Sequence, residues 1–208
     1  MSNRVLIYGA GAIGRGFLAP LLSRHNCRIS FVDMDEALIS ELQARKQYQA
    51  AVTATSEYEF ITVQVENAYL PGEVPLIEDF DLVVSCVGPK NCYDLVKYFR
   101  DARAVISCEN DQSTVKALQE LSGNNNIFFG IPDVITSSTA PPDLLKQDPL
   151  MTVTERGVLV LQKGNYQLTP EILQVSDDKL QMHWICKLFI HNAPHAIVAY
   201  LGWLKCYI

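Results

Sequence analysis

The stretch Arg4-Val-Leu-Ile-Tyr-Gly-Ala-Gly-Ala-Ile-Gly-Arg-Gly-Phe17 decides the fold of this chain. Its apolar beginning predicts a strand that stops at the glycines, and apolar residues at helical spacing follow them. A second strand is expected over residues 28–33 and a second helix over residues 35–45. A strand, a helix and a strand within about 30 residues are typical of one βαβ unit.

The spacing Gly-x-Gly-x-x-Gly is typical of a turn that binds the pyrophosphate of a dinucleotide. Gly9 would make the tight turn, Gly11 would let the backbone approach the phosphates, and Gly14 would let the helix pack closely on the strand. The free N–H groups at the helix start, at Ala12 and Ile13, would hold the phosphates. Glycine clusters are common, so a turn without a ligand stays an alternative.

Asp33 lies at the end of the second expected strand, where a carboxylate accepts hydrogen bonds from the ribose hydroxyls of adenosine. A carboxylate would also repel a 2′-phosphate, which favours NAD over NADP. Two alternatives stay open. Arg15 or Arg28 could reach a 2′-phosphate, and Asp33 could be no more than a helix cap.

The rest of the first 150 residues alternates between apolar strands and helices. Strands are expected over residues 81–87, 104–108 and 127–130, and helices over 91–100 and 112–121. Residues 48–65, rich in Val, Thr, Tyr and Phe, predict two or three antiparallel strands. The fold class is therefore α/β: a Rossmann-like, doubly wound, mostly parallel sheet with an antiparallel extension.

Beyond Pro142 the pattern changes. Residues 151–161 alternate around a glycine and predict a strand pair or hairpin. Helical spacing starts at residue 177, where Asp177 or Asp178 could cap the helix. Pro194 cannot lie inside an unbroken helix, so a break is expected near residue 192, with Pro194 in the first turn of a new helix.

We therefore expect a dinucleotide-binding domain over residues 1–175 and the first helices of a truncated C-terminal substrate domain over residues 176–208. The apolar segment 197–208 is expected to dock on the first domain or to associate with another copy of the chain.

Composition limits the function classes. The chain has 208 residues, 49% of them hydrophobic, and a net charge of −6 from 17 basic and 23 acidic residues. This balance argues against nucleic-acid binding. The sequence shows neither an apolar run of about 18 residues nor a secretory signal, so no membrane partner and a cytoplasmic location are expected. The six cysteines form no C-x-x-C pair and are expected to be reduced core thiols.

Polar side chains follow the expected strands where a Rossmann sheet presents its ligand site. Gly88 follows the strand over 81–87, and Glu109 and Asn110 follow the strand over 104–108. We expect these three residues to border the cofactor. Asp133 follows the last of these strands.

Three further candidates, Lys187, Asn192 and His195, lie near the end of the chain. On an unbroken helix Lys187 and His195 would be roughly 80° apart. Each residue alone is more often a solvated charge or a cap. His191 and His195 could form half a metal site, but the sequence shows no third ligand beside them, so no metal is expected.

The chain resembles the polyol-specific long-chain dehydrogenases, the mannitol dehydrogenase family. The matching motifs follow the family's order, and Lys-x4-Asn-x2-His is specific to it. The matching runs are Gly9-Ala-Gly-Ala-Ile-Gly-Arg-Gly-Phe17, Ser107-Cys-Glu-Asn110, Asp148-Pro-Leu150, Lys187-Leu-Phe-Ile-His-Asn-Ala-Pro-His-Ala196 and Ala199-Tyr-Leu-Gly202.

This resemblance implies an NAD-dependent enzyme without a metal that oxidises a secondary carbinol of a polyol or polyol phosphate to a ketose. Lys187 would be the general base, Asn110 and Asn192 would hold the developing alkoxide, and Asp133 and His195 would line the substrate site. A lysine serves as a base near neutral pH only if burial or a nearby cation lowers its pKa.

The chain departs from the family pattern in several places. Val134 stands where the family usually has arginine, no glutamate lies shortly before the lysine, and Pro194 replaces a small residue. Family members also continue into a large helical domain. Two alternatives therefore stay open: a truncated or decayed homologue that binds NAD without catalysis, or a dehydrogenase for another polyol or sugar acid.

Overall fold

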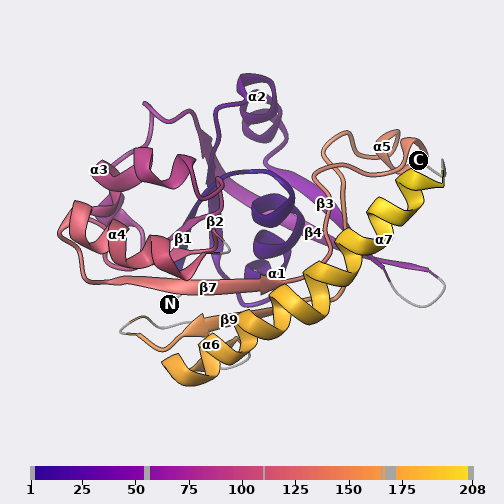
Figure 1. The fold of residues 1–208 in the computed structure, drawn as a ribbon. Coiled ribbons are helices and arrows are strands. Elements are labelled where there is room, and N and C mark those ends of the chain that lie inside the picture. Colours follow the sequence, from indigo (N-terminus) through magenta and orange to yellow (C-terminus); the bar gives the residue numbers. More distant parts are fainter. Residues whose placement is uncertain (1–2, 54–56, 110, 165, 167–171, 206–208) are drawn as a thin grey trace.

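The structure is a computed structural model that describes residues 3–53, 57–109, 111–164, 166 and 172–205 (Figure 1). Asn110 and Cys206 lie outside the described residues. The strands are β1 Arg4–Tyr8, β2 Arg28–Val32, β3 Gln47–Thr53, β4 Tyr58–Tyr69, β5 Leu82–Ser85, β6 Val105–Ser107, β7 Ile127–Asp133, β8 Thr152–Thr154, β9 Val158–Gln162 and β10 Leu173–Val175. The helices are η1 Ala12–Leu18, α1 Ala19–Ser23, α2 Glu36–Arg45, η2 Ile77–Asp79, η3 Asn91–Leu95, α3 Val96–Phe99, α4 Gln112–Ser122, α5 Pro142–Leu145, α6 Asp177–Cys186, η4 Lys187–Asn192 and α7 Ala193–Leu204.

Strand β1 lies inside a mostly parallel sheet. It pairs in parallel with β2 on one side and with β5 on the other, and parallel pairing continues through β6 to β7. The complete order is β10-β9-β7-β6-β5-β1-β2-β4-β3-β8, with β3 antiparallel to β4. The doubly wound fold and its antiparallel extension are confirmed. The chain reverses its direction of winding between β1 and β5, and ligands bind at such a point.

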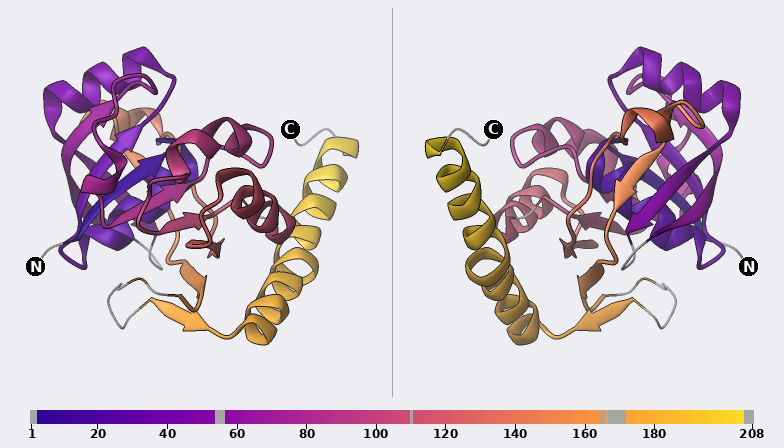
Figure 2. Two further views of the ribbon diagram at one scale, coloured as in Figure 1. Left: turned by 90° about the vertical axis from the view of Figure 1, so that its left-hand side faces the viewer. Right: turned by 90° about the vertical axis from the view of Figure 1, so that its right-hand side faces the viewer.

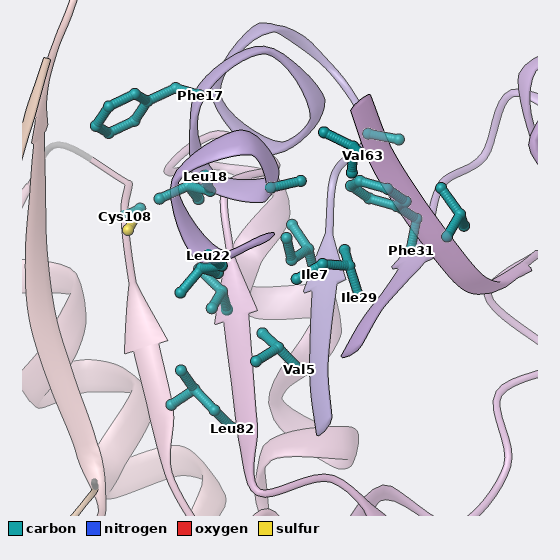
Figure 3. Packing of buried hydrophobic residues seen from close by; sticks show 14 of the residues in the cluster. Val5, Ile7, Phe17, Leu18, Leu22, Ile29, Phe31, Val63, Leu82 and Cys108 are labelled. Atoms are coloured by element: carbon teal, nitrogen blue, oxygen red, sulfur yellow. The ribbon is translucent and has the colours of Figure 1, made fainter. Parts of the chain in front are cut away.

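Apolar side chains of β1 point alternately into two layers of core. Val5 and Ile7 pack with Leu22 of α1, and Figure 3 shows this layer between the sheet and the first helices. Leu6 packs in the opposite layer with Phe99 of α3. Helices therefore cover both faces of the sheet, which explains why its strands are apolar throughout.

The helix expected over residues 91–100 is α-helical only at its end. Its first part, η3, is a tight 3₁₀ turn, and α3 spans Val96–Phe99. The N–H groups of Asn91 and Cys92 both donate to the carbonyl of Gly88, whose φ of +96° turns the chain sharply. This local turn prevents regular α-helical pairing at the start.

The hairpin expected over residues 151–161 is wrong. Strand β8 pairs in parallel with β3, whereas β9 pairs antiparallel with β7. Gly157 between them packs against Val134, where a Cβ would lie 2.5 Å from that side chain. The connection from β8 to β9 is short, so β8 at one end of the strand order must lie close to β7 and β9 near the other end. A bridge between Thr136, which follows β7, and Thr154 of β8 joins the two ends.

The break expected near residue 192 is also wrong. Helices α6, η4 and α7 form one continuous helix that extends beside the sheet (Figures 1 and 2). Its N-cap position is Ser176, which makes no side-chain capping hydrogen bond, and Asp177 and Asp178 lie in the first turn, so neither aspartate is the cap. In η4 the N–H of Ala193 donates to the carbonyl of Leu188, five residues back. This wider turn accommodates Pro194, which lies in the first turn of α7 as expected.

The apolar end of this helix does not dock on the rest of the chain. None of the described residues of α7 is buried, and the exposed side chains include Val198, Tyr200 and Trp203. Docking on the first domain is therefore wrong for the described residues, because the helix axis carries α7 away from the sheet (Figure 2). Association with another copy stays a prediction. Among the described residues, no helix is both long enough and apolar enough to span a bilayer.

The described cysteines are free thiols. Cys92 and Cys108 are buried and Cys27 and Cys86 are half-buried, as expected for core thiols. Cys186 is exposed on α6, so it is not a core thiol.

Candidate functional site

The glycine turn after β1 has a distinct requirement at each glycine. Gly9 has a φ of +99°, and a Cβ there would lie 2.7 Å from the Cys86 carbonyl oxygen. At Gly14 a Cβ would lie 1.8 Å from the Gly9 oxygen, so only glycine lets the helix start this close to the strand. At Gly11 a Cβ would meet nothing within 4 Å. The backbone at Gly11 is therefore open to an approaching group.

The amino end of η1 faces this opening. The helix begins at Ala12, directly after Gly11, and its first turn carries no acidic side chain. N–H groups and the positive end of a helix dipole favour an anion at such a position. The residues that form the turn therefore fit a bound pyrophosphate.

Asp33 is tied to the same turn. Its Oδ2 accepts a hydrogen bond from the N–H of Ala10 at 2.6 Å, and its Oδ1 accepts one from Asp35 at 3.1 Å. The cap of α2 is Asp35, which accepts from the N–H of Leu38. The alternative that Asp33 is only a helix cap is therefore wrong, and its carboxylate lies beside the glycine turn at the end of β2.

Neither arginine considered as a 2′-phosphate ligand is placed for that role. Arg15 is 5% exposed, and its guanidinium donates to the carbonyl oxygens of Ala10, Ser138 and Leu150. Arg28 begins β2, at the end of the strand opposite Asp33, and lies 3.3 Å from the Glu66 carboxylate. Both arginine side chains therefore contact other groups of the protein.

Glu109 holds the loop after β5. The side chain is 3% exposed; its Oε1 accepts from the Ser85 hydroxyl and the Val87 N–H, and its Oε2 accepts from the Gly88 N–H at 2.6 Å. The structure therefore brings Glu109 and Gly88 together beside the winding reversal. With both oxygens engaged by this loop, Glu109 shapes the loop. The neighbouring Asn110 lies outside the described residues.

Lys187 is buried at the carboxyl end of β7. The residue is 8% exposed, and its Nζ donates a hydrogen bond to the Pro132 carbonyl at 2.6 Å. Burial lowers the pKa of Lys187 below its usual value, while the Asp133 carboxylate and the Cys108 thiol act in the opposite direction. Burial of this kind is what lets a lysine act as a proton acceptor nearer neutral pH.

A pocket of about 320 Å³ brings several predicted residues together. Lys187, His195 and Asp133 all line it, although they come from two separate parts of the chain. Asn192 is half-buried next to them and is not among the lining residues. The complete lining is Asp133, His183, Cys186, Lys187, Ile190, His191, Pro194 and His195.

His191 also lines this pocket, although its place in the sequence suggested only half of a metal site. Its Nδ1 lies 3.0 Å from the Asp133 Oδ1, and its ring centroid lies 4.8 Å from that of His195. The spacing of Lys187, His191 and His195, one helical turn apart each time, is the signal that could have found it. Within the described part of the chain, no three His, Cys, Asp or Glu side chains gather as a metal site would require.

Solved structures resemble this fold at low sequence identity. Yersinopine dehydrogenase aligns with a TM-score of 0.56 and 15% identity, over 91% of this chain and 45% of that one. A putative 2-dehydropantoate 2-reductase from Enterococcus faecalis aligns with a TM-score of 0.58 and 16% identity, over 88% of this chain and 52% of that one. These similarities show a Rossmann-type fold.

Sequence relatives are more specific. The mannitol-1-phosphate 5-dehydrogenase of Clostridium acetobutylicum is 27% identical over 98% of this chain, and that of Mycoplasmopsis pulmonis is 26% identical over 98%. The chain spans 60% and 58% of their lengths. The family model of the mannitol dehydrogenase Rossmann domain matches residues 3–121. That match covers more than half of the sequence, and the chain therefore belongs to the mannitol dehydrogenase family.

Proposed function

We propose that this chain carries the cofactor site and the reacting groups of an NAD-dependent polyol-phosphate dehydrogenase. The reaction would be the oxidation of mannitol 1-phosphate, or a similar polyol, to fructose 6-phosphate or a similar ketose. The observation that carries the proposal is the buried Lys187 in a pocket with Asp133 and His195, in a chain whose first strand ends in an open glycine turn.

The glycine turn and Asp33 would hold the dinucleotide. The N–H groups at Ala12 and Ile13 would bind the pyrophosphate over the open backbone of Gly11, and Asp33 would accept from the adenosine ribose. A carboxylate at this position disfavours a 2′-phosphate, which supports NAD over NADP. Bound NAD would supply the hydride acceptor.

Lys187 would remove the proton of the substrate hydroxyl. The loss of hydride from a carbinol leaves a carbonyl only if the hydroxyl proton departs, and a buried amine is suited to accept it. Asn192 and Asn110 would stabilise the oxygen on which negative charge develops, because amide donors do not compete for the proton. Asp133 and His195 would line the substrate site.

The organisation of the chain follows from these roles. We assign residues 1–175 to the dinucleotide-binding domain and residues 176–208 to the first helices of a substrate domain. The partners would be a small polyol or sugar-phosphate substrate and, through the exposed face of α7, a second copy of the chain.

A second candidate is a chain that binds NAD without catalysis. The departure at Val134 favours it, because this side chain packs against the backbone of Gly157, where the family usually offers an arginine. Calorimetric titration with NAD, followed by detection of NADH formed from mannitol 1-phosphate, separates the two. NAD binding with NADH formation supports the enzyme; NAD binding without NADH from any polyol in a panel supports the second candidate.

A further inference from the structure

Arg15 is a buried charged side chain of η1, in the position directly after Gly14. The residue is 5% exposed, and its guanidinium donates to three main-chain carbonyls. Nε donates to Ala10 at 3.2 Å, Nη2 donates to Ser138 at 2.6 Å, and Nη1 donates to Leu150. Ser138 and Leu150 lie between β7 and β8, far along the chain from the glycine turn. The guanidinium therefore joins the turn to a distant segment.

Ala10, between the first two glycines of the turn, is held through both of its polar main-chain groups. Its carbonyl accepts the hydrogen bond from Arg15, and its N–H donates to the Asp33 Oδ2 at 2.6 Å. Asp33 is the carboxylate that lies beside the turn at the end of β2. A movement of Ala10 would therefore move the donor that holds this carboxylate.

The surroundings of η1 fix Arg15 itself. Its guanidinium carbon lies 5.6 Å from the centroid of the Tyr48 ring, and the Tyr48 hydroxyl donates to the Arg15 carbonyl at 2.6 Å. The segment after β7 contacts the same helix, because the Thr136 hydroxyl donates to the Ala12 carbonyl at 3.3 Å. A Cβ at Gly16 would lie 2.4 Å from that hydroxyl oxygen, so this packing is close. Arg15 thus holds Ala10 from a fixed base.

A buried cation is a costly side chain for a contact that only fills space. Its desolvation is offset only when its hydrogen bonds have good geometry, and an apolar side chain of similar volume often serves stability equally well. The planar fork of a guanidinium donates to several acceptors in fixed directions, which neither an apolar side chain nor an ammonium group does. The three carbonyls around Arg15 therefore point to a requirement for position.

We propose that Arg15 is a positioning residue that acts through Ala10: it holds the Asp33 carboxylate in the place where this group would meet the adenosine ribose of a dinucleotide. Arg15 makes no contact with the cofactor in this arrangement. The effect on cofactor affinity rests on the proposed function, whereas the hold on Ala10 does not.

The test is a double-mutant cycle with NAD as the probe. Arg15→Met removes the hydrogen bonds, Arg15→Lys keeps the charge without the planar fork, and Asp33→Ala removes the carboxylate. Arg28→Met is the matched control, because it also removes one positive charge, at the opposite end of β2 from Asp33. Calorimetric titration measures the dissociation constant of NAD. Hydrogen exchange of the unliganded chain, followed by NMR, measures the protection of the Ala10 N–H.

We expect Arg15→Met and Arg15→Lys to weaken NAD binding about tenfold, since a hydrogen bond to a charged group contributes on this scale. In the Asp33→Ala background, Arg15→Met should change the affinity by less than about twofold, because the group that Arg15 positions is absent. Arg28→Met should bind NAD as the unchanged chain does. Equal losses in both backgrounds would overturn the proposal, and so would full affinity in Arg15→Lys, which would assign the effect to charge alone.

The exchange measurement decides the matter if Arg15→Met does not fold or if NAD does not bind. Arg15→Lys, the milder change, should speed exchange of the Ala10 N–H at least about fivefold relative to Arg28→Met, because local opening becomes easier. Equal protection in these two variants would contradict the hold on Ala10. If the unchanged chain binds no NAD, the proposed function fails, and the positioning role of Arg15 stands or falls on this exchange rate.

Discussion

The glycine turn makes opposite predictions for two substitutions three residues apart. In Gly14→Ala the new Cβ would lie 1.8 Å from the Gly9 oxygen and 3.1 Å from the Cys86 Sγ. Real atoms do not approach this closely, so η1 must move away from β1 by more than about 1 Å. In Gly11→Ala the new Cβ would meet nothing within 4 Å, so the fold has no reason to change.

The magnitudes follow from this contrast. Gly14→Ala overpacks a buried helix–strand contact, and we expect a loss of about 3 kcal/mol in the free energy of unfolding. Gly11→Ala adds a methyl group where the pyrophosphate would approach. Its stability should change by less than about 1 kcal/mol, while its affinity for NAD should fall at least about tenfold, or 1.4 kcal/mol.

Urea denaturation measures the free energy of unfolding, and calorimetric titration measures the affinity for NAD. Gly72→Ala is the matched control, because its Cβ would also meet nothing within 4 Å and it is not part of the glycine turn. If Gly11→Ala binds NAD as tightly as Gly72→Ala does, the pyrophosphate does not lie over Gly11. If Gly14→Ala is as stable as the unchanged chain, the close packing argued from the structure is wrong.

Three further outcomes are expected. Asp33→Ala should weaken NAD binding and bring the dissociation constants of NAD and NADP closer together; an unchanged ratio in titrations would remove Asp33 from the ribose. Because burial lowers the pKa of Lys187 below its usual 10.5, the unfolded chain binds more protons between the two values. The free energy of unfolding should therefore rise with pH across that window, and Lys187→Met should flatten the rise in denaturation curves. Sedimentation should show self-association of the chain that Val198→Glu with Trp203→Glu abolishes, since both side chains are exposed; a monomer in both cases would contradict association through α7.

Local patterns predicted the parts of the fold that depend on neighbours in sequence. The apolar run before Gly9 and the helical spacing after it predict β1 and the helix that follows, and the segment 48–65, rich in Val, Thr, Tyr and Phe, forms most of the pair β3 and β4. In each case the apolar period matches the element that buries it.

Such local patterns do not predict which strands pair when they lie far apart in the sequence. The alternation of residues 151–161 predicts strands but not their partners, and β8 and β9 pair with β3 and β7 instead of with each other. Pro194 signals a helix break only if every turn is α-helical, whereas the wider turn at Ala193 absorbs it.

The candidate site also combines residues that a local motif predicts with contacts that depend on long-range packing. Gly9, Gly11 and Gly14 follow a motif with one physical purpose for each position, so their environment could be anticipated. The contact of His191 with Asp133 depends on how the last helix packs against β7. Helical spacing alone relates His191 to Lys187 but says nothing about the strand that faces them.

In the proposed reaction Lys187 accepts a proton from a polyol while the glycine turn holds NAD. The most direct test is the formation of NADH from mannitol 1-phosphate by the unchanged chain and by Lys187→Met, with NAD affinity measured on both. We expect NADH from the unchanged chain, at least about a hundredfold less from the variant, and similar affinities for NAD. Equal rates of NADH formation by the two proteins would contradict this expectation.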